Sequence, residues 1–193
     1  MKPDDVLALF RSVGALLEGH FRLSSGLHSN GYMQSALVLQ HPDHAATLGR
    51  ALADAVRRLD PQVVLSPALG GLIIGHEVAR ALGVRAIFAE RVDGVLTLRR
   101  GFSLAAAERV LVVEDVVTTG KSTLETSAVG EAAEARFVAA ASILDRSGGR
   151  AQLPVPLAAL LSLDLPTWSA ESCPLCAEGS VAVKPGSRPR PPA

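Results

Sequence analysis

The sequence predicts an α/β fold in which helices flank a central, mostly parallel sheet. Short apolar runs alternate along the chain with segments of helical periodicity, a pattern typical of βαβ units joined by right-handed crossovers. One run, Arg-Val-Leu-Val-Val at 109–113, is apolar enough to be a central strand covered on both faces. Hydrophobic residues make up 48% of the 193 residues, which suffices for one domain with short additional segments.

The N-terminal part of the chain predicts two helices separated by extended segments. Apolar side chains recur with helical spacing over 4–18, and Pro42 opens a second helix that ends near residue 58. Between these helices, 20–26 is expected to be extended and to end in a turn, and 32–40 has mixed strand character.

From residue 62 onward the expected strands and helices alternate. The strands are expected at 62–66, 85–90, 95–99, 109–113, 137–144 and 157–163. Helices are expected from the end of the turn 67–71 to residue 82, and over 121–135. Asp93-Gly94 between two of these strands is a hairpin signal. Parallel sheets bind ligands at the carboxyl ends of their strands, so the loops that follow the strands are the places to look for a site.

The charge balance argues against two classes of partner. The chain has 19 basic and 19 acidic residues, so it is not expected to wrap nucleic acid or to make a polybasic contact with a membrane. None of its apolar runs reaches the roughly 18 residues that span a bilayer. The acidic start, Met-Lys-Pro-Asp-Asp, is unlike a secretory signal, so a cytoplasmic protein is expected.

The loop after the central strand carries the clearest chemical signal. Glu114 and Asp115 close the strand, and a hydroxyl-rich turn leads through Gly120 into the next helix. Backbone N–H groups at a helix N-terminus, together with Thr and Ser hydroxyls, form an anion site that suits a phosphate monoester. The turn imitates the end of a Walker A loop, but Asp115 stands where that motif requires glycine. The alternative is that the two acids only cap the helix.

This segment resembles the 5-phosphoribosyl-1-pyrophosphate (PRPP) signature of type I phosphoribosyltransferases. The resemblance implies the type I phosphoribosyltransferase fold, with an N-terminal helix and small hood (1–44), an α/β core (45–165), and a C-terminal CxxC segment with a disordered tail (166–193). It also implies that the ribose and the 5′-phosphate of PRPP bind to Glu114, Asp115, Val116, Val117, Thr118, Thr119, Gly120, Lys121 and Ser122.

Other segments narrow the resemblance to the orotate phosphoribosyltransferases. Residues 19–29, Gly-His-Phe-Arg-Leu-Ser-Ser-Gly-Leu-His-Ser, are similar to the N-terminal signature of that family. Arg146 follows the next strand at a position where the family has an arginine that faces the orotate carboxylate, and a guanidinium fork suits a planar anionic base. The C-terminal segment, with Cys173-Pro-Leu-Cys176, resembles that of a shorter bacterial subgroup.

The resemblance implies transfer of the 5-phosphoribosyl group from PRPP to orotate, giving orotidine 5′-monophosphate and pyrophosphate in UMP biosynthesis. The expected catalytic residues are Glu114, Asp115 and Arg91; orotate is expected to contact Thr118, Arg146 and Ser25, and the pyrophosphate side of PRPP to contact Gly70, Gly71 and Arg91. Arg99 and Arg100 are alternatives to Arg91 as the source of positive charge. The resemblance also implies Mg²⁺ held mainly by PRPP, and a homodimer in which Arg91 serves the other subunit's site.

Several alternatives stay open at this point. The protein could be a phosphoribosyltransferase for a purine or for uracil, or a PRPP-binding regulator without catalysis. Cys173 and Cys176 could be half of a zinc site, a redox pair, a disulfide or plain thiols, because the five histidines are distant from them in sequence. His28, beside the turn at 23–26, could contact substrate or lie on the surface.

Overall fold

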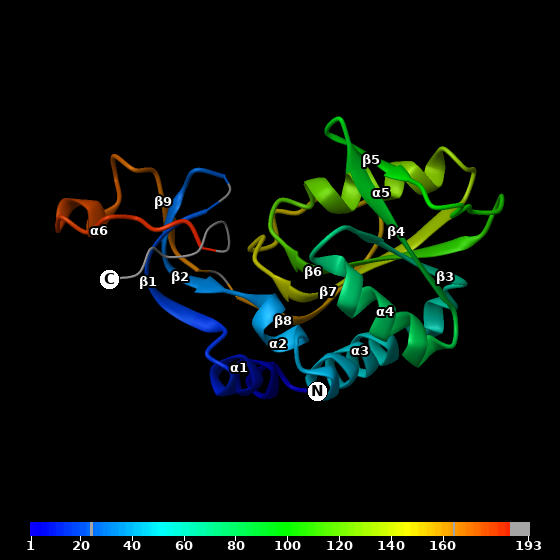
Figure 1. Ribbon diagram of the computed structural model, residues 1–193, viewed down its shortest axis with the longest axis horizontal. Helices are drawn as coiled ribbons and strands as arrows, with labels where there is room; N and C mark the ends of the chain where they lie inside the picture. The colour runs from blue at the N-terminus through cyan, green and yellow to red at the C-terminus, as the bar shows by residue number, and fades with distance from the viewer. Residues whose placement is uncertain (24, 164, 186–193) are drawn as a thin grey trace.

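The computed structural model describes residues 1–23, 25–163 and 165–185 and confirms the α/β fold class. Its central sheet has six strands in the order β5-β4-β3-β6-β7-β8 (Figure 1). The strands are β3 (Val63–Pro67), β4 (Arg85–Val92), β5 (Val95–Leu98), β6 (Arg109–Val117), β7 (Arg136–Asp145) and β8 (Leu157–Ser162). All pairings are parallel except that of β4 with β5, which form the hairpin predicted at Asp93-Gly94.

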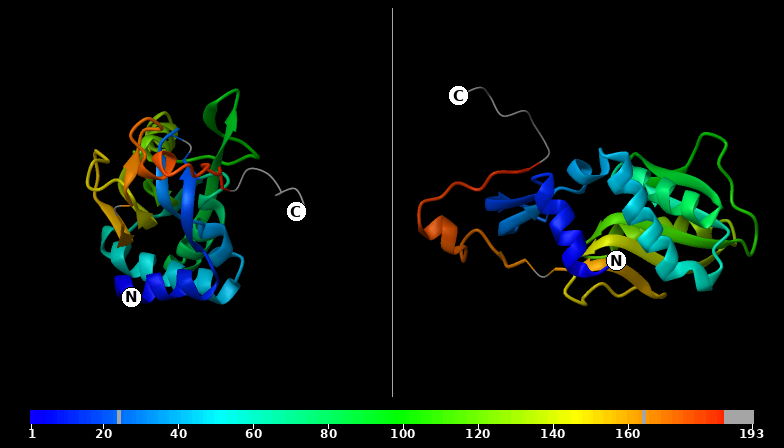
Figure 2. Two further views of the ribbon diagram at one scale, coloured as in Figure 1. Left: turned by 90° about the vertical axis from the view of Figure 1, so that its left-hand side faces the viewer. Right: turned by 90° about the horizontal axis from the view of Figure 1, so that it is seen from below.

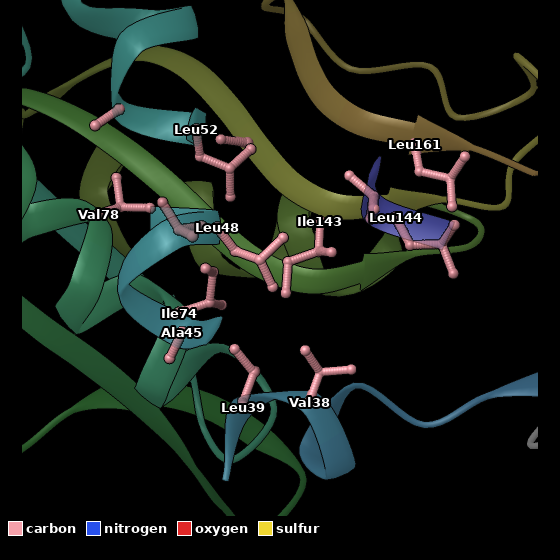
Figure 3. Close-up of a cluster of buried hydrophobic side chains, with 14 of the residues drawn as sticks. Val38, Leu39, Ala45, Leu48, Leu52, Ile74, Val78, Ile143, Leu144 and Leu161 are labelled. Carbon is pink, nitrogen blue, oxygen red and sulfur yellow. The ribbon is translucent and has the colours of Figure 1, made fainter. Parts of the chain in front are cut away.

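Helices cover both faces of this sheet (Figures 1 and 2). One face packs against α1 (Pro3–Ser12), α2 (Ser35–Leu39), α3 (Pro42–Val56) and α4 (Gly71–Leu82), and the other against α5 (Lys121–Glu131). Neighbouring residues of one strand serve opposite faces: Val64 belongs to the first cluster, and Val63 and Leu65 belong to the second. In Figure 3, side chains of α2, α3 and α4 converge on Ile143, Leu144 and Leu161 of the sheet.

A second, three-stranded antiparallel sheet forms a hood from both ends of the chain. It contains β1 (Leu16–Arg22), β2 (His28–Met33) and β9 (Thr167–Trp168), and the short helix α6 (Pro174–Ala177) lies beyond β9 (Figure 1). Ser29 of β2 pairs with Thr167 of β9, and Phe21 of β1 bridges to Val183. The division into 1–44, 45–165 and 166–193 stays a prediction, and the tail at 186–193 lies outside the described residues.

Two local predictions in the N-terminal part are wrong. The helix expected over 4–18 ends at Ser12, because Gly14 adopts a left-handed φ of +65° and the N–H of Ala15 donates back to the carbonyl of Phe10 at 2.8 Å. The following apolar residues, which continue the helical spacing, belong instead to β1. The segment 32–40 is not a strand: β2 ends at Met33 and the chain then forms α2.

The remaining elements agree with the sequence to within a few residues. A 3₁₀ turn, η1 (Arg57–Leu59), extends α3 to the expected end near residue 58, and α5 is shorter than the helix expected over 121–135. In the described parts of the chain, none of the helices combines the length and the apolar character that crossing a bilayer requires.

Close contact between α3 and α4 makes Gly49 a sensitive position. A Cβ added there would lie 2.6 Å from Cβ of Glu77 and 2.8 Å from its carbonyl carbon, so α4 would have to move. We expect Gly49→Ala to lower the free energy of unfolding by about 1–3 kcal/mol, despite the better helix propensity of alanine. Urea denaturation measures this change.

Gly130 provides a matched control within α5. Its added Cβ would meet Leu104 Cδ1 at 3.7 Å, an ordinary contact, so Gly130→Ala should leave stability unchanged or raise it by up to about 1 kcal/mol. Equal effects of the two substitutions would contradict the packing argument.

Candidate active site

A cavity of about 560 Å³ lies between the hood and the carboxyl ends of β6 and β7. Its walls combine apolar side chains with a few charged and hydroxyl groups: Leu23, Ser25, Leu27, Tyr32, Met33, Gln34, Asp115, Val116, Thr118, Thr119, Arg146, Arg150, Leu165 and Thr167. The carboxyl ends of parallel strands are the usual ligand-binding edge of such a sheet, and this cavity has the size of a small-molecule site.

The two acids of β6 face different surroundings. Asp115 lines the large cavity, whereas Glu114 is only 8% exposed and lines a small adjoining hollow. Burial raises the pKa of Glu114 to about 7, although the hydroxyl of Thr123 donates a hydrogen bond to its carboxylate. Burial also raises the pKa of Asp115, and the backbone N–H of Val116 opposes this shift. Glu114 contacts α5 through the side-chain hydroxyl of Thr123, and Asp115 lines the large cavity, so the two acids do more than cap the helix.

Asp115 is held from behind by the loop after β3. A Cβ on Gly70 would lie 2.5 Å from a carboxylate oxygen of Asp115, so only glycine fits there without displacing the acid. Gly71 is packed as tightly, because its added Cβ would approach the carbonyl oxygen of Val113 to 2.8 Å. Neither glycine lines the two cavities described here, so their predicted contact with pyrophosphate stays a prediction, while their packing against β6 is a finding.

The loop from β6 to α5 forms the small hollow of about 30 Å³. Gly120 turns the chain with a φ of +77°, and the N–H of Lys121 donates to the hydroxyl oxygen of Thr119 at 3.3 Å. The first turn of α5 points its free N–H groups into this region, which favours an anion. Thr118 and Thr119 border both cavities, so one ligand can extend from the hollow into the large cavity.

The loop after β7 brings two arginines to the same cavity. Its backbone is tied down where it leaves β7: the N–H of Arg146 donates to the carbonyl of Val117 at 2.8 Å, and the N–H of Ser147 donates to the carboxylate of Asp145 at 2.8 Å. Arg146 and Arg150 both line the cavity. Tyr32 lies within the electrostatic reach of Arg146, since burial and the charge of Asp115 raise the pKa of Tyr32 while the cation of Arg146 opposes this shift.

Known proteins are similar to this chain in sequence and in fold. Orotate phosphoribosyltransferases of Heliobacterium modesticaldum and Pelotomaculum thermopropionicum are 53% and 51% identical to the chain, over 97% of its length and 99–100% of theirs. The chain belongs to the orotate phosphoribosyltransferase family. A Mycobacterium tuberculosis orotate phosphoribosyltransferase, solved in complex with PRPP, is 25% identical with a TM-score of 0.66, covering 82% of this chain and 96% of that one. No family model matches the sequence.

Membership in the orotate phosphoribosyltransferase family confirms the family and fold implied by the PRPP signature and the 19–29 segment. Six of the expected substrate contacts meet in one cavity: Ser25, Asp115, Val116, Thr118, Thr119 and Arg146. These residues come from the hood and from the ends of two adjacent strands. The resemblance identified them individually, and the tertiary structure shows that they line the same cavity.

Arg91 lies away from this cavity. It is the penultimate residue of β4, where its guanidinium pairs with Glu125 of α5 and donates to the carbonyl of Gly94 at 2.7 Å. Arg100, just after β5, pairs with Glu90 at 3.0 Å. The cations expected near pyrophosphate are therefore paired with acids at the β4–β5 hairpin (Figure 1), outside the two cavities described here.

Sequence analysis missed several lining residues of the cavity. Arg150 follows Arg146 by four residues in the same glycine-rich loop, and that repetition of a guanidinium was a usable signal. Gln34 and Thr167 gave no such signal, because Thr167 reaches the cavity only through the pairing of β9 with β2.

The two cysteines meet two histidines in the hood. His20 and His28 lie beside Cys173 and Cys176, and their potential ligand atoms all lie within 4.8 Å of one another. Both expectations for His28 are wrong, because this residue is 7% exposed and faces the cysteines rather than solvent or the cavity.

The raised pKa of Glu114 makes stability depend on pH. The folded protein keeps a proton on this carboxyl up to about pH 7, whereas the unfolded chain, with a carboxyl pKa near 4.5, releases it earlier. The stabilisation is therefore complete below the unfolded pKa and is lost as the pH rises through the folded one. We expect Glu114→Gln to gain up to about 3 kcal/mol in free energy of unfolding relative to the wild type between about pH 4.5 and pH 7.5.

Paired urea denaturation curves across this range measure the difference. Glu131→Gln, at the exposed end of α5, is the matched control and should run parallel to the wild type. A Glu114→Gln curve that also runs parallel to the wild type would contradict the assigned shift.

Proposed function

We propose that the large cavity is where this orotate phosphoribosyltransferase family member transfers the 5-phosphoribosyl group of PRPP to orotate. N1 of orotate joins C1 of the ribose, pyrophosphate leaves, and orotidine 5′-monophosphate forms for pyrimidine nucleotide synthesis. One observation carries the proposal: a phosphate-type loop, a buried carboxylate and a pair of arginines line one continuous space at the ligand-binding edge of the sheet.

The 5′-phosphate occupies the small hollow in this proposal. The backbone N–H groups at the start of α5 and the hydroxyls of Thr118, Thr119 and Ser122 donate to its oxygens. Lys121 adds a positive charge from the surface, where its ammonium lies 3.8 Å from Glu125. The hollow opens into the large cavity at Thr118 and Thr119, which directs the ribose toward Asp115.

Glu114 and Asp115 hold the ribose in this proposal. Carboxylates accept hydrogen bonds from the 2′- and 3′-hydroxyls and face the positive charge that develops on C1 as the bond to pyrophosphate breaks. No covalent attack by the protein is needed, because holding both reactants in line and stabilising the separating charges lowers the barrier. The packing of Gly70 against Asp115 fixes the carboxylate for this task.

Orotate binds at the arginine wall. The guanidinium of Arg146 forms paired hydrogen bonds with the carboxylate of the base, and Arg150 adds a second cation nearby. Ser25 and Thr118 supply polar contacts, while Leu27 and Leu165 enclose the flat ring. A neutral base offers no carboxylate to the two guanidinium groups, which favours a carboxylated pyrimidine over uracil or a purine.

Magnesium belongs to the same proposal. The donor set fits this hard cation, because the acid that lines the cavity, Asp115, offers carboxylate oxygens. PRPP itself would hold most of the ion, with Asp115 and Glu114 as the adjacent protein oxygens. When bound, magnesium neutralises charge on the departing pyrophosphate.

A homodimer with shared sites completes the proposal. Arg91 projects from a hairpin that does not line the cavity of its own chain, so its action on pyrophosphate requires the cavity of a second copy. Arg91 pairs with Glu125 within its own chain. In the proposed dimer, the pyrophosphate group bound to the second copy replaces Glu125 as the partner of this guanidinium. A cytoplasmic location is inferred as well, supported by the two cysteines, which are free rather than disulfide-bonded.

Orotate consumption and Arg146 variants test the base site. With PRPP and magnesium, we expect the wild type to consume orotate, seen as loss of its absorbance, but not uracil or adenine. Arg146→Ala removes a charged hydrogen bond worth about 1.5–3 kcal/mol and should raise the KM for orotate roughly ten- to a hundredfold, leaving the KM for PRPP nearly unchanged.

Arg136→Ala is the matched control, because Arg136 is exposed and begins β7, the strand after which Arg146 follows. It should keep wild-type kinetics. Equal increases of both KM values in Arg146→Ala would reject its role as the anchor of the base, and consumption of another base instead of orotate would reject the proposed substrate.

Mixed dimers test the shared site. Arg91→Ala and Asp115→Asn should each lose most of kcat as homodimers, because every site then lacks one group. After refolding the two variants together, about half of the dimers are mixed and carry one intact site, so about a quarter of the wild-type activity should return.

Size-exclusion chromatography confirms that the mixed sample is dimeric. A mixture that stays as inactive as its components would show that both groups act within one chain or that no dimer forms. Full activity of Arg91→Ala alone would remove this residue from the mechanism.

A further inference from the structure

The hood contains a cluster of metal-ligating side chains that the proposed reaction does not use. His20 comes from β1 and His28 from the start of β2, whereas Cys173 is the N-cap of α6 and Cys176 lies within that helix. The histidines and the cysteines lie about 150 residues apart in sequence and meet because β9 pairs with β2 and Val183 bridges to β1. We propose that these four side chains bind a structural zinc ion, which fastens the C-terminal segment of the hood to its β1–β2 hairpin.

Three sulfur–nitrogen distances in the cluster lie close to the edges of a tetrahedron around zinc. Cys173 Sγ lies 3.4 Å from His20 Nε2, and Cys176 Sγ lies 3.8 Å from His20 Nε2 and 3.3 Å from His28 Nδ1. The two histidine nitrogens are 2.9 Å apart. With Zn–S near 2.3 Å and Zn–N near 2.0 Å, tetrahedral geometry requires N···S edges of about 3.5 Å and an N···N edge of about 3.3 Å.

The tautomer of His20 also suits a metal, because the ring nitrogen that faces the cysteines carries no proton. Its Nδ1 lies 3.1 Å from the carbonyl oxygen of Ser180, which can only accept a hydrogen bond. The ring proton of neutral His20 is therefore on Nδ1, and the lone pair of Nε2 points at the cysteines. Zinc-bound histidines characteristically donate their other N–H to such a carbonyl, which fixes the ring and strengthens the ligand.

The ligand set indicates a structural rather than a catalytic ion. Two thiolates and two imidazoles complete four-fold coordination and leave no position open for substrate or water. Cys173 is 2% exposed, and His20 and His28 are each 7% exposed, so the site is closed to solvent on most sides. A disulfide between the cysteines would not explain why two histidine nitrogens converge on them.

The hood needs such a fastening because it lacks an apolar core of its own. In the described chain, neither hydrophobic cluster includes a residue from 17–32 or 165–185. Small units with little buried apolar surface are commonly stabilised by a metal. Zinc would hold β9 and the β1–β2 hairpin together, and through Thr167 and Leu27 it would set the wall of the substrate cavity.

Metal analysis of the full-length protein tests the site directly. We expect one zinc per chain after purification in reducing buffer, and loss of that zinc in Cys176→Ser. His76→Ala, which removes an exposed histidine of α4, is the matched control and should keep the metal. A chelator should lower the melting temperature of the wild type, zinc should restore it, and Cys176→Ser should respond to neither.

Cobalt substitution of the wild type does not depend on the folding of a variant. Cobalt(II) in this site should give thiolate-to-metal charge transfer in the near ultraviolet and the strong visible bands of tetrahedral coordination. Reduced protein that takes up neither metal, zinc that persists in Cys176→Ser, or a cobalt spectrum without thiolate bands would each overturn the proposal. A Cys173–Cys176 disulfide in the freshly isolated protein would overturn it too.

Discussion

Burial of both faces of β6 is the constraint on which the rest of this structure depends. Its alternate side chains, Leu111 and Val113 on one face and Val110 and Val112 on the other, belong to two separate hydrophobic clusters. A strand that is covered on both faces can carry polar functional side chains only at its end, where the chain leaves the sheet. The acids and the anion-binding turn therefore follow directly after the apolar run, at the edge where neighbouring parallel strands also end.

The different surroundings of the two acids follow from the same strand geometry. Successive residues of a strand point to opposite sides, so Glu114 enters a hollow beside Thr123 while Asp115 faces the large cavity. Burial pushes the pKa of both carboxyls upward, and the arginines of the β7 loop line the same cavity as Asp115. A ligand with a cationic centre between two anionic ends is complementary to this order of charges.

The hood is organised on a different principle. Its strands come from the two ends of the chain, and its interior is a histidine–cysteine cluster instead of an apolar core. A few directional bonds at one point can order such a small sheet, whereas hydrophobic burial needs more area than it offers. The core supplies rigid acids and arginines, and the hood supplies the side chains that close over them.

Local sequence determined the elements whose signals lie within a few residues. The apolar run and acids of β6, the turn at Gly120, the Asp93-Gly94 hairpin and the strand–helix alternation all obey short-range rules of periodicity and turn chemistry. The same rules failed over 4–18, because apolar spacing alone could not separate a helix from the strand that follows the left-handed Gly14.

Tertiary structure decided everything that depends on pairing between distant segments. Sequence spacing left Cys173 and Cys176 without partners, and the pairing of β9 with β2, together with the bridge of Val183 to β1, brings His20 and His28 to them. The fold likewise placed Thr167 in the cavity and left Arg91 outside it, paired with Glu125 of α5. The spacing of apolar residues along the chain shows whether a segment has the period of a helix or of a strand. It does not show which distant segments pair in a sheet, because that pairing depends on the surfaces that the whole chain can bury together.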